Sequence, residues 1–424
     1  MADELESLDG LHRSVVVIGG GQAGLSISHE LVGRQIDHLV LERHSVGYEW
    51  RERRWDSFCL VTPNRQCLLP GFAYAGKDPD GFMVRDEIVG WLEAYAASFG
   101  PPVLEGVAAT RLWRSADGRF VVETSRGTIS SDQVVLAAGP YQTPVIPRMA
   151  ERLPKSVLQL HSSEYRNPEQ LPAGAVLIIG TGQSGCQIAE DLHLAGREVH
   201  LATGTAPRVA PFYRSRDCMT WLDEIGHYSK GIDEFADQDA TRFKVNHYVT
   251  GRDGGHDLDL RAFAKDGMRL YGRALAVDAE TTSICFADDL ASNLDGADRI
   301  SESIKDLIDA HIAANGIEAP AEERYVPVWR PESPDTRLDL AESGVGSVIW
   351  STGYRRDYRW IDLPMFDGRG YPTHRRGVTS QPGLYVLGLP WQYTWGSGRF
   401  RGVGADAEYL AAEIEARTGQ RMVA

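Results

Sequence analysis

The sequence predicts an α/β fold with two domains of the same kind, because one pattern occurs twice along the 424 residues. Each copy begins with a short apolar run rich in β-branched residues, at 15–18 and 176–179, which is typical of a buried parallel strand. Each run leads into the spacing Gly-x-Gly-x-x-Gly and then into a helical stretch. A second apolar strand follows, at 38–41 and 199–202, so each copy starts a β-α-β unit. We therefore expect two Rossmann-like dinucleotide-binding domains.

The glycines of the two motifs have a physical purpose. The first glycine permits a tight turn, the second lets the backbone approach a pyrophosphate, and the third lets helix and strand pack closely. The helix N-terminus then presents free N–H groups to the phosphates. The expected cofactor-binding residues are Gly19, Gly21, Gln22, Ala23 and Gly24 in the first copy, and Gly180, Gly182, Gln183, Ser184 and Gly185 in the second.

The residue that ends the second strand predicts which nucleotide binds at each motif. Glu42 lies 18 residues after Gly24, where a carboxylate accepts hydrogen bonds from a ribose 2′-hydroxyl and repels a 2′-phosphate. In the second copy the matching position is Thr203 or Gly204, neither of which is acidic, and Arg208 follows. A neutral site beside an arginine suits a 2′-phosphate, although Arg208 could also be a solvated loop residue. We expect FAD at the first motif and NADPH at the second.

Further patterns predict the remaining elements and the connection between the domains. Strands are expected at 119–124, 128–130, 133–139, 347–354 and 383–389, and helices at 301–314 and 405–417. Pro140, Pro144 and Pro147 follow the strand that ends at Gly139, which indicates a stiff connector. The expected arrangement is a discontinuous FAD-binding domain at 1–150 and 350–424, and an NADPH-binding domain at 151–349 with a partly helical insert around 211–260.

Composition excludes several classes of protein. Hydrophobic residues make up 42% and charged residues 24%, as in a globular protein with a large core. The net charge of -15 argues against nucleic acid or an anionic membrane surface as a partner. The chain has no apolar stretch of about 20 residues and no signal-peptide pattern, so we expect a cytoplasmic protein. Its 5 cysteines form no C-x-x-C or metal-like cluster, so we expect neither a metal site nor a redox dithiol.

The two glycine motifs, the strand that ends at Gly139 and the segment Thr352-Gly353-Tyr354 together resemble the flavin-containing monooxygenases among the flavoproteins with two dinucleotide-binding domains. The resemblance spans nearly the whole chain. It implies domains of the three-layer ββα type, with the NADPH domain inserted in the FAD domain. The segments 55–64 and 389–398 look more like the bacterial flavin-dependent oxidoreductases that are encoded beside a nitrilase in a gene cluster.

One fingerprint of that family is only half matched. His161, Tyr165 and Arg166 occupy its later positions, whereas Lys155 and Val157 stand where an aromatic residue and a glycine belong. This departure puts the standard subclass in doubt but leaves the two-nucleotide plan intact. His161 could equally be a connector histidine with a structural hydrogen bond.

The resemblance implies a specific chemistry. NADPH passes a hydride to flavin N5, O2 adds at C4a, and the resulting hydroperoxide oxygenates a nitrogen or sulfur of a small molecule. The alternatives are Baeyer-Villiger-type oxygenation of a carbonyl, a reductase that passes electrons to a protein or small acceptor, and a non-catalytic redox sensor. The partners are then the small-molecule substrate and O2, and a homodimer is the expectation for the class.

The resemblance also assigns residues around the flavin. Asn64 is the expected amide donor to the C4a adduct, or else an asparagine that stabilises a turn. Trp391 and Trp395 are expected to wall a dry substrate pocket, or to pack in the core. Arg399 and Arg401 could contact a flavin phosphate or an acidic substrate, or face solvent. Further expected cofactor contacts are Arg43, Gly47, Trp50, Arg51, Ala138, Gly139, Thr352, Gly353, Gly388 and Gly402.

Overall fold

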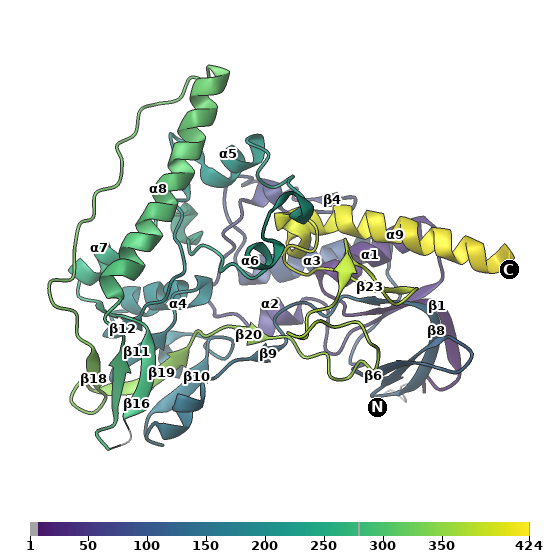
Figure 1. The fold of residues 1–424 in the computed structure, drawn as a ribbon, viewed down its shortest axis with the longest axis horizontal. Helices are drawn as coiled ribbons and strands as arrows, with labels where there is room; N and C mark the ends of the chain where they lie inside the picture. The colour runs from purple at the N-terminus through teal and green to yellow at the C-terminus, as the bar shows by residue number, and fades with distance from the viewer. Residues whose placement is uncertain (1–6, 279, 424) are drawn as a thin grey trace.

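A computed structural model describes residues 7–278 and 280–423 and shows two α/β halves, each built on a parallel sheet (Figure 1). The strands of the first sheet are β1 (Leu11–Ile18), β2 (His38–Leu41), β5 (Val103–Leu104), β6 (Ala109–Arg114), β7 (Phe120–Thr124), β8 (Gly127–Leu136), β21 (His374–Arg375), β22 (Val378–Thr379) and β23 (Leu384–Val386). Their order is β21-β22-β23-β8-β1-β2-β5, and the antiparallel pair β6 and β7 extends from β8. The four central neighbours β23, β8, β1 and β2 run parallel.

The second half contains a five-stranded parallel sheet and a three-stranded antiparallel sheet. The parallel sheet consists of β10 (Leu158–His161), β19 (Val345–Trp350), β11 (Ala175–Ile179), β12 (Val199–Ala202) and β15 (Arg269–Tyr271), in that spatial order. The antiparallel sheet consists of β16 (Ala274–Asp278), β17 (Ser283–Phe286) and β18 (Arg337–Asp339). Val277, Ile284 and Leu338 of this sheet share one buried core with Leu177 and Val348 of the parallel sheet.

Helices cover the two parallel sheets. The helices are α1 (Gln22–Gly33), α2 (Tyr48–Glu52), α3 (Arg85–Phe99), α4 (Gln183–Leu194), α5 (Cys218–Glu224), α6 (Gln238–Arg242), α7 (Leu260–Lys265), α8 (Leu290–Asn315) and α9 (Phe400–Val423). Leu31, Leu92 and Leu410 bring α1, α3 and α9 into one core with β1. Ile188 and Leu294 bring α4 and α8 into the core beneath β11 and β12.

The chain leaves the first sheet after β8 and returns to it after β19. The outgoing strand β9 (Thr143–Pro144) pairs antiparallel with the returning strand β20 (Tyr354–Arg355), so both connections lie side by side between the halves (Figure 1). Val145 N donates to the Gly353 carbonyl at 3.0 Å and extends this pairing. The second half is therefore an insertion in the first, and the expected α/β fold with two parallel sheets is confirmed.

Most sequence-predicted elements are present, with differences in their extent. The strand expected at 347–354 is divided into β19 and β20, and the strand expected at 383–389 is limited to β23. The strands expected at 128–130 and 133–139 form the single strand β8, because Ser131 and Gln133 continue the pairing with β1. The amphipathic helix is longer than 301–314 and spans α8. The terminal helix α9 starts at Phe400 rather than near residue 405.

The 211–260 segment is a mixture of short elements. It contains the hairpin β13 (Phe212–Tyr213) and β14 (Arg216–Asp217), and also α5, α6 and irregular chain. A further short hairpin, β3 (Leu68–Leu69) with β4 (Phe72–Ala73), lies beside α9. None of the helices described here is both long and apolar enough to cross a membrane.

Candidate functional site

The first glycine motif forms a tight turn between β1 and α1. Gly19 has a φ of +113°, and a Cβ there would lie 2.4 Å from the Ala137 carbonyl oxygen. A Cβ on Gly24 would lie 1.8 Å from the Gly19 carbonyl oxygen. By contrast, a Cβ on Gly21 would meet nothing within 4 Å. The first and third glycines therefore serve close packing, and the second leaves the backbone open to a ligand.

The second motif repeats this geometry between β11 and α4. Gly180 has a φ of +107°, and a Cβ there would lie 2.5 Å from the Ser351 carbonyl oxygen. A Cβ on Gly185 would lie 1.9 Å from the Gly180 carbonyl oxygen, whereas Gly182 has open space in front. Gln183 begins α4, and its side chain donates to the Val249 carbonyl of the 211–260 segment. Ser184, the next residue of α4, is partly exposed at the same turn.

Glu42 directly follows β2 and lies beside the first motif. Its carboxylate accepts a hydrogen bond from Gly20 N at 2.7 Å and another from His44 N at 2.8 Å. The carboxylate is thus held against the glycine turn and partly exposed, and Arg43 beside it points to solvent as an exposed side chain. This is the position from which a carboxylate can accept a hydrogen bond from a ribose hydroxyl.

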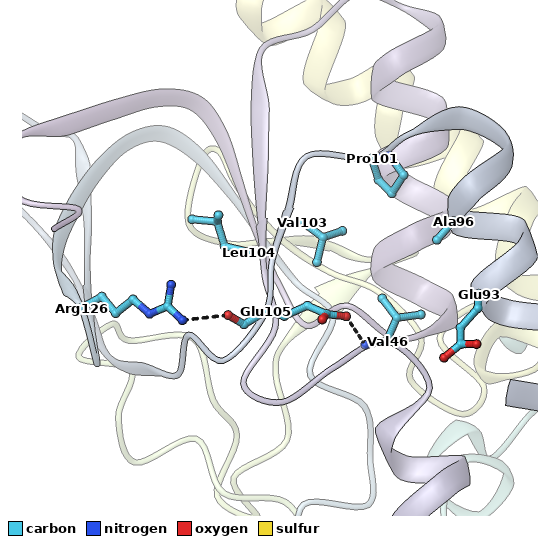
Figure 2. Close-up of a pocket in the computed structure, with 8 residues that line it drawn as sticks. All are labelled: Val46, Glu93, Ala96, Pro101, Val103, Leu104, Glu105 and Arg126. Carbon is cyan, nitrogen blue, oxygen red and sulfur yellow. Dashed lines mark hydrogen bonds between the residues drawn. The ribbon is translucent and has the colours of Figure 1, made fainter. Parts of the chain in front are cut away.

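A hollow of about 510 Å³ opens one strand away from Glu42 (Figure 2). It is lined by Val46, Glu93, Ala96, Pro101, Val103, Leu104, Glu105 and Arg126. Leu104 pairs with Leu41, directly before Glu42. Figure 2 shows the Glu105 side chain bonded to Val46 N at 2.8 Å, and Arg126 bonded to the Glu105 carbonyl at 3.1 Å. The hollow is largely apolar with a charged rim.

Thr203 and Arg208 are engaged within the protein. The Thr203 hydroxyl donates to the Tyr271 carbonyl at 2.8 Å and accepts from Asn293. Arg208 is only 2% exposed and is therefore not a solvated loop residue. Its guanidinium pairs with three carboxylates, at 3.1 Å in Asp257, 3.7 Å in Asp259 and 2.9 Å in Asp298. Although burial alone would lower the pKa of Arg208, these carboxylates hold it above its ordinary value. The structure therefore places Arg208 in a buried ionic cluster, so its expected contact with a 2′-phosphate stays a prediction.

The segment after Glu42 lies against α3 and α9. Gly47 has a φ of +78° and precedes α2. The Trp50 ring stacks on Phe400 at 5.6 Å between centroids, which ties α2 to the first turn of α9. Arg51 pairs with Glu93 of α3 at 2.5 Å. The three expected flavin contacts of this segment lie together, with Arg51 bound to a protein carboxylate.

Asn64 is buried at 3% exposure, and both ends of its amide have backbone partners. Its Nδ2 donates to the Asp78 carbonyl at 2.9 Å, and its Oδ1 accepts from Met83 N at 2.7 Å. The side chain therefore holds the 78–83 loop in place, as the turn interpretation expects. Its role as a donor toward the flavin stays a prediction.

The C-terminal segment covers the start of α1. Gln22 Nε2 donates to the Gly398 carbonyl at 3.1 Å. A Cβ on Gly388 would lie 2.7 Å from the Ala23 Cβ, so this close contact requires glycine. A Cβ on Gly402 would lie 2.4 Å from the Gly396 carbonyl carbon. The close packing of Gly388 and Gly402 brings the segment to the first nucleotide turn.

Trp391 and Trp395 face the 211–260 segment. Trp391 lies edge-on to Phe235 at 5.2 Å, and Trp395 lies 4.3 Å from Tyr228. Both rings are partly exposed, so they are not fully enclosed core residues. The two tryptophans thus join the C-terminal segment to the insert.

The two connections between the halves supply a further group of residues. Ala138 is exposed directly after β8, and Gly139 has a φ of +67° with open space around it. Thr352 donates to the Val145 carbonyl, and Gly353 has a φ of +82°. His161 Nε2 lies 3.0 Å from the Gly353 carbonyl oxygen, which is the structural hydrogen bond of a connector histidine. Burial lowers the pKa of His161 below its ordinary value.

Sequence patterns missed a polar centre on α4. Asp191 accepts hydrogen bonds from Ser57 at 2.6 Å, Tyr165 at 2.7 Å and Arg252 at 2.9 Å. These partners come from the first half, the connector and the insert, so one buried carboxylate joins three parts of the chain. The signal in the sequence was an acidic residue inside the predicted helix.

Among the residues described, no group of three or more His, Cys, Asp or Glu side chains is placed to hold a metal ion. The 5 cysteines are all free thiols. Burial raises the pKa of Cys59 to about 11 and that of Cys67 and Cys218 to about 12.

The chain is similar to known oxidoreductases. Residues 16–223 match the family model of the pyridine nucleotide-disulphide oxidoreductases. The chain is similar to an uncharacterized CzcO-like oxidoreductase of Geobacillus kaustophilus, with 34% identity over 407 residues, which cover 94% of this chain and 97% of the relative.

Solved structures share the fold. A flavin-containing monooxygenase from Stenotrophomonas maltophilia superposes with a TM-score of 0.67 at 20% identity, covering 96% of this chain and 99% of the other. An ornithine N-hydroxylase from Kutzneria sp. 744 gives 0.62 at 17% identity, with coverage of 96% and 100%. An S-allyl-L-cysteine S-oxygenase from Allium sativum gives 0.59 at 17% identity, with coverage of 95% and 77%.

Proposed function

This chain belongs to the CzcO-like oxidoreductases, and from that premise we propose that it is a flavin monooxygenase, dependent on FAD and consuming NADPH, that acts on a small molecule. The oxygenated atom is a nitrogen or a sulfur. The observation that carries the proposal is the pair of glycine turns, each with its first and third glycines packed tightly and its second glycine open.

The residues present fit two dinucleotides. At the first turn, Gly21 leaves room for a pyrophosphate. Glu42 is held where its carboxylate can accept a hydrogen bond from a ribose hydroxyl. At the second turn, Gly182 leaves the same room at the start of α4. Thr203, at the position that matches Glu42, is not acidic, which favours NADPH over NADH. The preference is weak because Arg208 pairs with Asp298 instead of facing the nucleotide. We accordingly assign FAD to the first half and NADPH to the second.

A bound flavin supplies the capacity to accept a hydride and to activate O2. The protein contributes binding, orientation and exclusion of water. Trp391 and Trp395, with Phe235 and Tyr228 opposite, form an aromatic wall between the C-terminal segment and the insert. Asn64 is the proposed amide donor near the flavin. Its bonds to the 78–83 loop hold the side chain in place.

Oxygenation of nitrogen or sulfur is supported by the names of two structural neighbours, an ornithine N-hydroxylase and an S-allyl-L-cysteine S-oxygenase. The matching family model favours a second candidate, an NADPH-dependent reductase. Disulfide chemistry on this chain is disfavoured because its buried thiols have raised pKa values and therefore few reactive thiolates. A protein or small-molecule acceptor other than a disulfide remains compatible with the reductase.

Several finer assignments belong to the same proposal. The FAD-binding domain comprises 1–150 and 350–424, and the NADPH-binding domain comprises 151–349. The protein acts in the cytoplasm as a homodimer and is encoded beside a nitrilase gene. Light scattering of the purified chain and the sequence of the neighbouring genes test the last two points.

The test is oxygen incorporation. Purified protein is supplied with NADPH, ¹⁸O-labelled O2 and a panel of amines and sulfides. We expect substrate-dependent NADPH oxidation and one labelled oxygen atom in the product. NADPH oxidation that requires an acceptor protein, with no labelled product, would favour the reductase.

A further inference from the structure

Arg399 is a guanidinium without an acidic partner. It lies between the short turn Trp395–Gly398 and α9. Its Nη2 donates to Asn246 Oδ1 at 2.9 Å, its Nη1 donates to the Trp395 carbonyl, and its Cζ lies 3.7 Å from the centroid of the Trp395 ring. Within residues 7–278 and 280–423 it forms no ion pair, whereas Arg401, two residues later, pairs with Asp223 at 2.6 Å.

Basic side chains lie around Arg399 in a protein whose net charge is -15. Burial first, and then Lys244, His227 and Arg399, lower the pKa of His247 to about 4. Burial, Lys230 and Lys244 lower the pKa of His227. No carboxylate contributes to either shift. The lowered pKa values leave both histidines neutral, Lys230 and Lys244 are exposed to solvent, and Asp217 and Asp223 act on the neighbouring Tyr228. The charge that calls for an anion is therefore that of Arg399 itself, which has hydrogen-bond partners but no carboxylate partner among the described residues.

Aromatic rings flank this charge. The Trp395 ring contacts both Arg399 and Tyr228, and the Tyr228 ring lies edge-on to His227 at 5.3 Å. In Figure 1 the teal 211–260 segment, which carries Tyr228 and Asn246, lies at the N-terminal end of α9, where the bond from Arg399 to Asn246 joins them. An anion bound by Arg399 would have flat apolar surface beside it.

Arg399 is also close to the first nucleotide turn. The preceding residue, Gly398, accepts the hydrogen bond from Gln22, which is the first residue of α1. An anion at Arg399 therefore lies at the edge of the proposed flavin site. Its source is either the substrate or a phosphate of FAD or NADPH.

We propose that Arg399 binds a carboxylate of the substrate, so that the oxygenated small molecule is an aromatic carboxylic acid. This inference rests on the proposed function and names its substrate class. The substrate is favoured over a cofactor phosphate because Gly21 and Gly182 already present open helix N-termini for the pyrophosphates.

The test uses a matched pair of sulfides, thioanisole and its para-carboxylated analogue. Their dissociation constants are measured from the perturbation of flavin absorbance on the FAD-loaded protein without NADPH. We expect the wild-type protein to bind the carboxylate at least about tenfold more tightly, because a charge-assisted bidentate bond contributes that much. Arg399→Gln should bring the ratio of the two constants close to one. Arg399→Lys should give an intermediate ratio, because lysine keeps the charge but loses the planar fork.

The matched control is Arg359→Gln, whose guanidinium is 85% exposed and pairs with Asp357. It should leave the ratio unchanged. An equal affinity of the wild-type protein for both sulfides, or an unchanged ratio in Arg399→Gln and Arg399→Lys, would overturn the inference. Loss of FAD or weaker NADPH binding in Arg399→Gln but not in the control would overturn it too, since the anion would then be a cofactor phosphate.

Because this experiment measures binding without turnover, its result is separate from that of the oxygenation test. A carboxylate preference that depends on Arg399 in a protein that oxygenates nothing would support the anion site and contradict the proposed function.

Discussion

Gly24 shows how strongly a single position constrains the first turn. A Cβ at this residue would lie 1.8 Å from the Gly19 carbonyl oxygen, which belongs to backbone and has no room to move. We expect Gly24→Ala to lower the free energy of unfolding by about 3 kcal/mol, the upper end of overpacking costs. The variant should also purify with little FAD. Thermal unfolding and the absorbance of bound flavin measure both effects.

Gly33 provides the matched control on the same helix. A Cβ there meets nothing within 4 Å. Gly33→Ala should keep its FAD and gain up to about 1 kcal/mol from helix propensity. Normal FAD content in both variants would contradict a nucleotide site at this turn.

The buried position of Arg208 predicts a role in stability, whereas its place in the sequence predicted a contact with NADPH. Its guanidinium is buried among Asp257, Asp259 and Asp298. Arg208→Gln would leave Asp257 and Asp259 without their cation and Asp298 paired only with Arg261, so we expect a loss of about 3–5 kcal/mol in stability. The ratio of KM for NADPH to KM for NADH should not change. Urea unfolding and steady-state kinetics with both coenzymes measure the two effects.

Arg269, with a side chain 60% exposed, is the control position. Arg269→Gln should change stability by less than about 0.5 kcal/mol. If Arg208→Gln instead raised only the KM for NADPH, the contact with a 2′-phosphate would be established. The sequence could not reveal the ionic cluster, because its three carboxylates come from two segments that only the fold brings together.

His374 predicts a pH dependence of stability. Burial, and then Arg242, lower its pKa from 6.5 to about 4. Between these two values the unfolded chain binds a proton that the folded chain does not, so the free energy of unfolding falls as the pH drops from 6.5 to 4. The effect of this group is about 1–3 kcal/mol over that window.

His374→Asn should make this decline shallower, because asparagine can still accept the bond that Gly377 N now donates to Nδ1 at 3.2 Å. Chemical unfolding at several pH values measures the slope. An unchanged slope in the variant would show that His374 does not contribute to the acid sensitivity.

At the scale of elements, Asp191 on α4 joins the first half, the connector and the insert. Asp191→Asn would weaken the bonds to Ser57, Tyr165 and Arg252, and we expect a loss of about 2 kcal/mol. Asp253→Asn is the control, because that carboxylate is 81% exposed. Differential scanning calorimetry of both variants tests this. Equal melting temperatures would contradict a structural role for Asp191.

The sequence predicted the β-α-β units well, because a buried parallel strand, a glycine turn and a helix each leave a local pattern. The strand ranges 38–41 and 199–202 coincide with β2 and β12. It predicted β8 and α9 less well. The continuity of β8 depends on pairing with β1, and the start of α9 at Phe400 depends on its stacking with Trp50.

At the scale of the molecule, the insertion of the second half in the first was predictable, because the prolines after Gly139 and the strand before Thr352 mark both connections. The contacts between the halves could not be predicted from the sequence. The contacts of Trp391 with Phe235, Trp395 with Tyr228, and Arg399 with Asn246 join residues more than 150 positions apart, and no periodicity encodes them. The proposed substrate site lies at this interface, which explains why sequence patterns located the cofactor turns more firmly than the substrate.

The central claim is that one chain holds two dinucleotides whose reactive rings meet. Anaerobic titration of the purified protein with NADPH, followed by flavin absorbance, tests it most directly. The account predicts a yellow protein with one FAD per chain, which NADPH bleaches, and loss of bleaching but not of colour in Gly185→Ala. A protein that stays colourless when FAD is supplied, or bound flavin that NADPH does not reduce, would contradict it.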